Sequence, residues 1–302
     1  MTEAFIREIQ KAAGYENTYL KERMEKYTTF RIGGPADVFV KPQKADDVVA
    51  ILKICRDADI PYFILGNGSN LLVSDAGFRG VVVQLDQNYQ NFYIKENRIM
   101  AQAGLLLSRL AAAARNASLT GLEYASGIPG TVGGAVVMNA GAYGGEIKDS
   151  LQTADILTQD LERRTVPVSE LELRYRHSRA MEEGWIILGA EFLLSPGEPE
   201  KIDARMEELR AARTEKQPLE YPSAGSTFKR PEGCFAGKLI MEAGLSGCSK
   251  GDAQISEKHC GFVINRGKAT ADDVCTLIRH VQDAVEKHSG IRLETEVRFL
   301  GF

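Results

Sequence analysis

The sequence has 302 residues, enough for about two domains that each bury a core. Its net charge is -4, with 37 Lys and Arg against 41 Asp and Glu, so we expect no basic surface for nucleic acid. No apolar run reaches the roughly 18 residues that span a bilayer, and the charged, amphipathic start lacks the apolar core of a signal peptide. We therefore expect a cytoplasmic protein without membrane insertion.

The cysteines predict neither a disulfide framework nor a metal site. They are five in number and form no CxxC pair, whereas disulfide frameworks and zinc sites need paired spacing. We expect inert thiols in a reducing compartment, at Cys55, Cys234, Cys248, Cys260 and Cys275.

The first 66 residues predict helices alternating with short strands. A polar helix is expected to about Lys26, followed by two short strands within residues 28–42 around a Gly-Gly-Pro break. Apolar residues at helical spacing then predict a helix over 45–59, which Pro61 ends. A short buried strand over 62–66 completes this part.

The middle of the chain predicts further strands around a glycine-dense segment. Residues 105–119 are strong helix formers, and residues 151–158 and 184–194 have strand patterns. Residues 121–145 hold so much glycine that a normal helix or strand is not expected there. A mostly charged helix over 201–216 then connects the two halves of the molecule.

The last third predicts a β-α-β unit that forms a compact second domain. A strand over 261–265 precedes a helix that Thr270 caps and Gly290 ends. Residues 291–301 alternate as a strand with Glu294 and Glu296 on its polar face. The opposite face is expected to hold Ile291, Leu293, Thr295, Val297 and Phe299.

Two glycine-rich stretches are candidate cofactor sites. The first follows a strand, and its amides can converge on a phosphate, although an ordinary Asn-Gly turn remains an alternative. It is not a Rossmann fingerprint, because Leu71 replaces the third glycine and no helix follows; no P-loop motif occurs either. Its residues are Gly66, Asn67, Gly68, Ser69 and Asn70.

The second stretch suits a backbone wrapped closely against a flat cofactor and its pyrophosphate. A purely structural glycine loop of this length remains the alternative. The residues concerned are Gly127, Gly130, Gly133 and Gly134.

From Tyr27 to the C-terminus the chain resembles the UDP-N-acetylenolpyruvoylglucosamine reductases. Six motifs carry this resemblance in order: TTFRIGG, ILGNGSNLLVSD, SGIPGTVGGAVVMNAGAYG, LRYRHSR, AGSTFKRP and LETEVRFLG. The resemblance implies an α+β fold with a two-part FAD-binding domain of the vanillyl-alcohol oxidase (PCMH) type and a smaller α+β substrate domain. The domain ranges we predict are an N-terminal helical segment at 1–26, the FAD domain at 27–200 and the substrate domain at 201–302.

The same resemblance implies that NADPH reduces FAD and that the flavin reduces an enolpyruvyl ether to UDP-N-acetylmuramate. Relatives of this fold often tether FAD through a histidine, but neither glycine stretch contains one, so we expect non-covalent FAD. We expect no partners beyond NADPH and the UDP-sugar, and a monomer. The sequence leaves the preference for NADPH over NADH open.

Three residues match the family's catalytic residues. Ser226 matches the proton donor, Arg176 the catalytic arginine that faces the substrate carboxylate, and Glu296 the catalytic glutamate. Read locally, each has a plainer interpretation: a serine in a turn, one of several solvated arginines, and an exposed strand carboxylate.

Other residues are predicted substrate contacts. Tyr143 resembles the family's substrate-contacting tyrosine, and Lys229 is close enough in sequence to assist Ser226. The remaining candidates rest on charge or proximity: Tyr175, Lys216, Gln217, Lys238 and Lys258. Arg230 stands where the family often has asparagine, and the short interval from Arg176 to Ser226 indicates the subtype without the extra tyrosine-bearing loop.

Two alternatives remain open at this stage. One is an oxidase or dehydrogenase of a sugar or alcohol on the same fold, which oxygen reactivity of the reduced flavin would favour. The other is a flavin or UDP-sugar binding module without catalysis, which a spectrum of the purified protein would separate from the two enzymes.

Overall fold

The computed structural model describes all 302 residues, which divide into two compact units. Unit 1 comprises residues 1–20, 38–67 and 80–213, and unit 2 comprises residues 21–37, 68–79 and 214–302. Two stretches from the first quarter of the chain therefore belong with the C-terminal third. The functional domain ranges 1–26, 27–200 and 201–302 stay a prediction.

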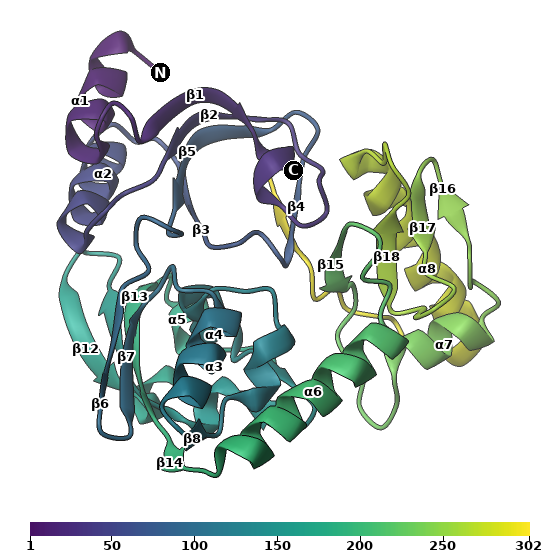
Figure 1. The fold of residues 1–302 in the computed structure, drawn as a ribbon. Helices are drawn as coiled ribbons and strands as arrows, with labels where there is room; N and C mark the ends of the chain where they lie inside the picture. The colour runs from purple at the N-terminus through teal and green to yellow at the C-terminus, as the bar shows by residue number, and fades with distance from the viewer. The chain divides into compact units, whose positions relative to one another are not determined.

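The N-terminal sheet has the strand order β1-β2-β5-β3. Helices α1 and α2 lie side by side against it (Figure 1). Their apolar faces, including Ile9, Ile51 and Leu52, share a core with Val38 and Val81 of the sheet. The elements are α1 (Glu3–Ala13), β1 (Thr18–Arg23), β2 (Pro35–Val40), α2 (Ala45–Asp57), β3 (Tyr62–Leu65) and β5 (Phe78–Gln84).

A second, antiparallel sheet in unit 1 has the order β12-β11-β13-β7-β6. Helices α3 and α4 pack on it and contribute to its core (Figure 1). Its elements are β6 (Phe92–Lys95), β7 (Arg98–Gln102), α3 (Leu107–Asn116), α4 (Val132–Met138), β11 (Leu151–Leu157), β12 (Arg163–Pro167) and β13 (Ile186–Leu193). Shorter elements complete the unit: β8 (Leu119–Thr120) with β14 (Ser195–Pro196), β9 (Gly141–Ala142) with β10 (Gly145–Glu146), α5 (Arg179–Glu182), and most of α6 (Pro199–Lys216).

Unit 2 contains a four-stranded sheet, β15-β18-β17-β16, with helix α8 packed on it. Its core joins Val263 and Leu277 to Phe30 and Leu72 from early in the chain. A parallel ribbon pairs β4 with β19. The elements are β4 (Leu71–Val73), β15 (Ser223–Ser226), α7 (Ala236–Glu242), β16 (Ser249–Lys250), β17 (Ala253–Ile255), β18 (Phe262–Asn265), α8 (Ala271–Ser289) and β19 (Arg298–Leu300).

The ends of α8 confirm the sequence prediction. The Thr270 hydroxyl accepts a hydrogen bond from the Asp273 amide at 3.0 Å, and the Asp273 carboxylate accepts one from the Thr270 amide at 2.9 Å. Gly290 follows the helix in the left-handed region, with φ of 73°. The Asp75 carboxylate accepts from two further first-turn amides, a contact that sequence spacing does not reveal.

Near the N-terminus, two predicted elements are wrong. The first helix ends at Ala13, because Gly14 turns away with φ of 91°, and strand β1 follows where helix was expected to Lys26. Residues 28–34 form a loop instead of a strand, since the Thr28 hydroxyl donates to the carbonyl of Ile32 at 3.0 Å.

Two further predictions fail in the later part of the chain. Residues 132–138 form the helix α4 despite Gly133 and Gly134; a Cβ at Gly133 would lie 2.9 Å from that of Ala103, so glycine permits this packing. Only residues 298–300 of the predicted final strand are extended, and they pair with β4. The expected β-α-β unit in one sheet is therefore absent, and Phe299 is 40% exposed instead of buried.

Candidate active site

In unit 1, the first glycine stretch meets the second. The Asn67 amide donates to the carbonyl of Pro129 at 2.6 Å. A Cβ at Gly66 would lie 2.3 Å from the Thr131 hydroxyl, so glycine is needed for this approach. The structure thus brings together two stretches that are about 60 residues apart in sequence.

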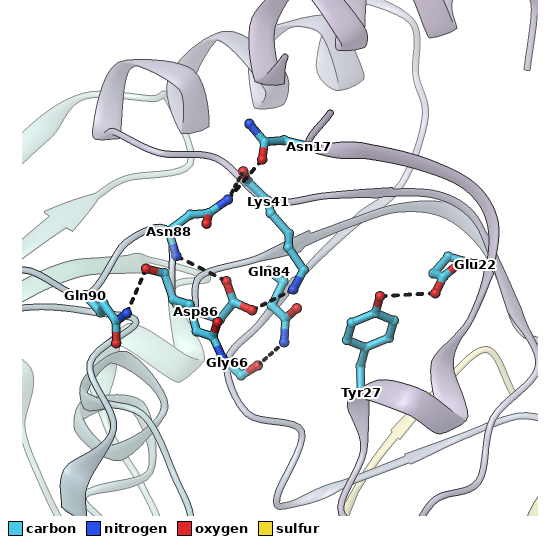
Figure 2. A network of polar contacts seen from close by, with 10 residues as sticks. Asn17, Glu22, Tyr27, Lys41, Gly66, Gln84, Asp86, Asn88 and Gln90 are labelled. Carbon is cyan, nitrogen blue, oxygen red and sulfur yellow. Dashed lines mark hydrogen bonds and ion pairs between the residues drawn. The ribbon is translucent and has the colours of Figure 1, made fainter. Parts of the chain in front are cut away.

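Gln84, at the end of β5, adds a polar group that sequence reasoning missed. Its amide nitrogen donates to the Gly66 carbonyl at 3.1 Å, while its amide oxygen is buried and lacks a partner (Figure 2). A buried acceptor without a donor is costly, and a hydroxyl or amino group of a nucleotide could satisfy it. The residues here therefore fit a nucleotide cofactor. The sequence signal for Gln84 was a polar residue within the otherwise apolar run VVVQL.

A polar network holds the chain just beyond Gln84 (Figure 2). The Lys41 ammonium lies 2.8 Å from the Asp86 carboxylate. The Asn88 amide donates to the side chain of Asn17 at 3.0 Å and to the main-chain carbonyl of Lys41 at 3.3 Å. These contacts fix the exit of β5 against the N-terminal part of unit 1.

In unit 2, the rest of the first glycine stretch is also closely constrained. Gly68 has a φ of 61°, and a Cβ there would lie 2.0 Å from the carbonyl oxygen of Tyr27. The Thr29 amide donates to the Gly68 carbonyl at 3.2 Å, while the Thr29 hydroxyl is buried without a partner. Ser69 is half-buried. The Asn70 side chain donates to the main-chain carbonyl of Glu296 at 3.0 Å, so it braces a predicted catalytic residue.

Main-chain hydrogen bonds bring Ser226 and Glu296 close together in unit 2. Ser226 ends β15, and the next carbonyl, that of Thr227, accepts from the Glu296 amide at 2.8 Å. The Lys229 amide donates to the Glu294 carbonyl at 2.9 Å, which continues the pairing. Ser226 is half-buried, and Glu296 is neither fully buried nor fully exposed. This proximity is what the two predicted roles require.

The predicted lysine contacts of unit 2 are dispersed. The Lys229 ammonium lies 3.1 Å from the Glu294 carboxylate, so its expected assistance to Ser226 competes with an ion pair. Lys238 lies 3.7 Å from Glu242 on α7, and Lys216 is exposed at the end of α6. Lys258 donates to the carbonyl of Thr214 at 2.8 Å.

In unit 1, Tyr175 and Arg176 form the tip of a tight turn. Two main-chain hydrogen bonds of 3.1 Å join Arg174 to His177 across it. Arg176 has a φ of 53°, a left-handed conformation that is uncommon for a residue other than glycine and typical of functional sites. Its guanidinium donates to the Gly141 carbonyl at 3.3 Å and lies 4.9 Å from the centre of the Tyr175 ring.

Asn139 fixes this turn and was missed by sequence reasoning. The side chain is fully buried and donates to the Arg174 carbonyl at 3.2 Å and to the Glu146 carboxylate at 3.0 Å. It also accepts from the Lys148 amide at 3.0 Å. Lys148, followed by Asn139, helps to keep the pKa of Glu146 below its usual value. Asn139 follows α4 in the left-handed conformation, where asparagine is one of the residues that commonly end a helix.

Tyr143 lies at the turn between β9 and β10, in the left-handed region and 41% exposed. Tyr143, Tyr175 and Arg176 thus belong to unit 1, whereas Ser226 and Glu296 belong to unit 2.

The chain contains no group of three His, Cys, Asp or Glu side chains suited to a metal ion. None of its helices combines the length and apolar character needed to cross a membrane.

Comparison with known proteins first defines the class. The family model described as FAD binding domain matches residues 36–165. A structure of the grass pollen allergen Phl p 4, described as having glucose dehydrogenase activity, shares the fold with a TM-score of 0.51 at 12% identity, over 65% of this chain and 44% of that chain. The chain is thus an FAD-binding protein of the α+β PCMH type, which confirms the predicted fold class and cofactor.

The family follows from full-length matches. A model for the C-terminal domain of UDP-N-acetylenolpyruvoylglucosamine reductase matches residues 217–300. The reductase of that name from Agathobacter rectalis is 52% identical, over 100% of this chain and 99% of its own length. The crystal structure of the Thermus caldophilus reductase has a TM-score of 0.80 at 37% identity, over 94% of this chain and 98% of that chain. The chain belongs to the UDP-N-acetylenolpyruvoylglucosamine reductase family.

Proposed function

We propose that this chain uses NADPH and FAD to reduce UDP-N-acetylglucosamine enolpyruvate to UDP-N-acetylmuramate, a precursor of peptidoglycan. Family membership over the whole chain supports the reaction. The observation that supports the assigned residues is the 2.8 Å main-chain hydrogen bond from the Glu296 amide to the carbonyl of Thr227, the residue that follows Ser226. When bound, FAD would carry reducing equivalents from NADPH to the enolpyruvyl double bond.

Ser226 is proposed to give its hydroxyl proton to one carbon of the double bond. Serine is a weak acid, so it serves this role only where the carbon is strongly basic and the resulting alkoxide is stabilised. Glu296 is proposed to contact the substrate carboxylate directly or through water.

Arg176 is proposed to bind the substrate carboxylate, on which negative charge grows as the double bond is reduced. A guanidinium is permanently charged and can bind a carboxylate through two hydrogen bonds. The short turn that carries Arg176 limits its motion, which favours a preorganised site.

The remaining contacts are proposed on exposure and charge. Tyr143 and Tyr175 are exposed enough to meet the sugar or the nicotinamide, and Lys216 and Lys238 to meet phosphates. Lys229 would first have to leave Glu294, which costs little in an exposed pair. We further propose that the protein acts in the cytoplasm as a monomer.

The test is Ser226→Ala in a two-step stopped-flow experiment. Reduction of the flavin by NADPH should be unchanged, because Ser226 takes no part in it. Reoxidation by the enolpyruvyl substrate should slow by about 10²–10⁴-fold, the usual effect of losing a general acid. Ser223→Ala, on the same strand, is the matched control and should leave both steps intact. Equal slowing of both steps would contradict the assignment.

A further inference from the structure

Arg213 is a half-buried arginine near the end of α6 whose side chain makes no hydrogen bond or ion pair within the protein. Other arginines of the same helix are paired: Arg205 lies 2.7 Å from Glu208, and Arg210 lies 2.7 Å from Glu207. Arg213 therefore differs from these two arginines, because it is less exposed to solvent and has no carboxylate as an ion-pair partner.

The side chain of Arg213 lies directly on Gly127, in the second glycine stretch. A Cβ at Gly127 would be 3.1 Å from Arg213 Cδ and 3.3 Å from Nη1. A side chain at position 127 would thus crowd the Arg213 side chain. Gly127 itself is exposed, so this part of unit 1 is open to a ligand.

Burial lowers the pKa of Arg213, and the nearby Tyr143 hydroxyl opposes this shift. An arginine nevertheless stays charged in proteins. A partly desolvated charge without a counter-charge is unfavourable. An anion that binds beside Arg213 would supply this counter-charge, so the attraction would favour binding. Arg213 is only half-buried, so part of its side chain stays accessible.

We propose that Arg213 binds an anionic oxygen of a nucleotide ligand, with Gly127 leaving room for its side chain. This inference rests on the proposed function for the identity of the nucleotides. Two of them can supply such an oxygen: FAD, through its diphosphate or, once reduced, its flavin ring, and the UDP-sugar, through its diphosphate or carboxylate. Arg213 interacts electrostatically with Tyr143, a predicted substrate contact, and touches Gly127, a predicted FAD contact.

The test measures binding without turnover. Arg213→Met and Arg213→Lys are compared with Arg210→Met, which removes an exposed charge from the same helix. One arm measures the FAD dissociation constant of the apoprotein by flavin fluorescence, together with the flavin midpoint potential. The other arm titrates the oxidised FAD-loaded protein with the enolpyruvyl UDP-sugar and follows flavin absorbance.

We expect Arg213→Met to weaken one of these dissociation constants at least tenfold, as for a lost charge-assisted hydrogen bond, and Arg213→Lys to weaken it less. Weaker FAD binding or a lower midpoint potential identifies FAD as the source, and weaker UDP-sugar binding identifies the substrate. Changes within about twofold of Arg210→Met in both arms would overturn the proposal.

Arg213→Gln serves as a second variant if Arg213→Met does not fold. It removes the charge but keeps a polar side chain, and it should weaken binding of the same ligand. An unchanged ligand affinity would overturn the proposal. If the unmodified protein binds both nucleotides but forms no UDP-N-acetylmuramate, the proposed function fails while this binding result still stands.

Discussion

The two groups of predicted catalytic residues are held in different ways. In unit 2, Ser226 and Glu296 are brought together by main-chain hydrogen bonds, which few side-chain substitutions would remove. In unit 1, main-chain hydrogen bonds close the turn that carries Arg176, but buried side chains attach this turn to the rest of the unit. The main ones are Asn139 and the fully buried Ser178, whose hydroxyl donates to the Val137 carbonyl at 2.7 Å. The position of Arg176 should therefore be more sensitive to mutation than that of Glu296.

The largest effect away from the reacting groups is expected for Asn139→Ala. Losing the three hydrogen bonds of this buried side chain leaves several polar groups unpaired, which should lower the free energy of unfolding by about 2–4 kcal/mol. Because the Arg176 turn loses its support, kcat should also fall, by about tenfold or more, while FAD binding is retained. Urea unfolding and steady-state kinetics measure the two effects.

Asn88→Ala is the control for this variant, since its side chain bonds elsewhere in unit 1. It should cost less stability and leave kcat unchanged. If both variants lowered kcat equally, the proposed dependence of Arg176 on Asn139 would be wrong.

An intermediate effect is expected for Thr227→Val in unit 2. The variant removes the hydroxyl that accepts from the Val263 amide at 3.0 Å, at a cost of about 1–3 kcal/mol. The main-chain carbonyl that binds Glu296 remains, so kcat should stay within about twofold of the original value. If kcat fell as much as in Asn139→Ala, the catalytic residues of unit 2 would be as sensitive to mutation as those of unit 1, and the proposed difference would be wrong.

The smallest effect is expected for Lys229→Met. Its ion pair with Glu294 is exposed, with 40% and 76% of the two side chains accessible, and such pairs contribute about 0–1 kcal/mol. Thermal unfolding should show almost no change. An increase in KM for the UDP-sugar would indicate that Lys229 leaves Glu294 to bind substrate, whereas an unchanged KM would remove it from the site.

The sequence correctly predicted elements whose ends are set by residues close together in the chain. The capping box at Thr270 and the stop at Gly290 are contained within a few residues, and both were confirmed. The ordered motifs identified the family and its cofactor, because each motif keeps its residues at fixed spacing. Motif matching also selected Ser226, Arg176 and Glu296, whose roles stay predictions.

The features that sequence could not provide depend on distant pairing. The last strand, β19, pairs with β4 more than 200 residues earlier, and this partner decides its extent. The side chains of Asn139 and Gln84 donate hydrogen bonds to the main-chain carbonyls of Arg174 and Gly66, respectively. No local sequence pattern predicts these partners. Arg213 stands out only because its neighbours on α6 have partners and it has none.

The most direct test of the central claim mixes the oxidised protein with NADPH without oxygen and then adds the enolpyruvyl UDP-sugar. The account predicts that the flavin absorbance is lost on the first mixing, returns on the second, and that one UDP-N-acetylmuramate forms for each flavin reoxidised. A flavin that NADPH bleaches but that only oxygen restores, with no UDP-N-acetylmuramate formed, would contradict it.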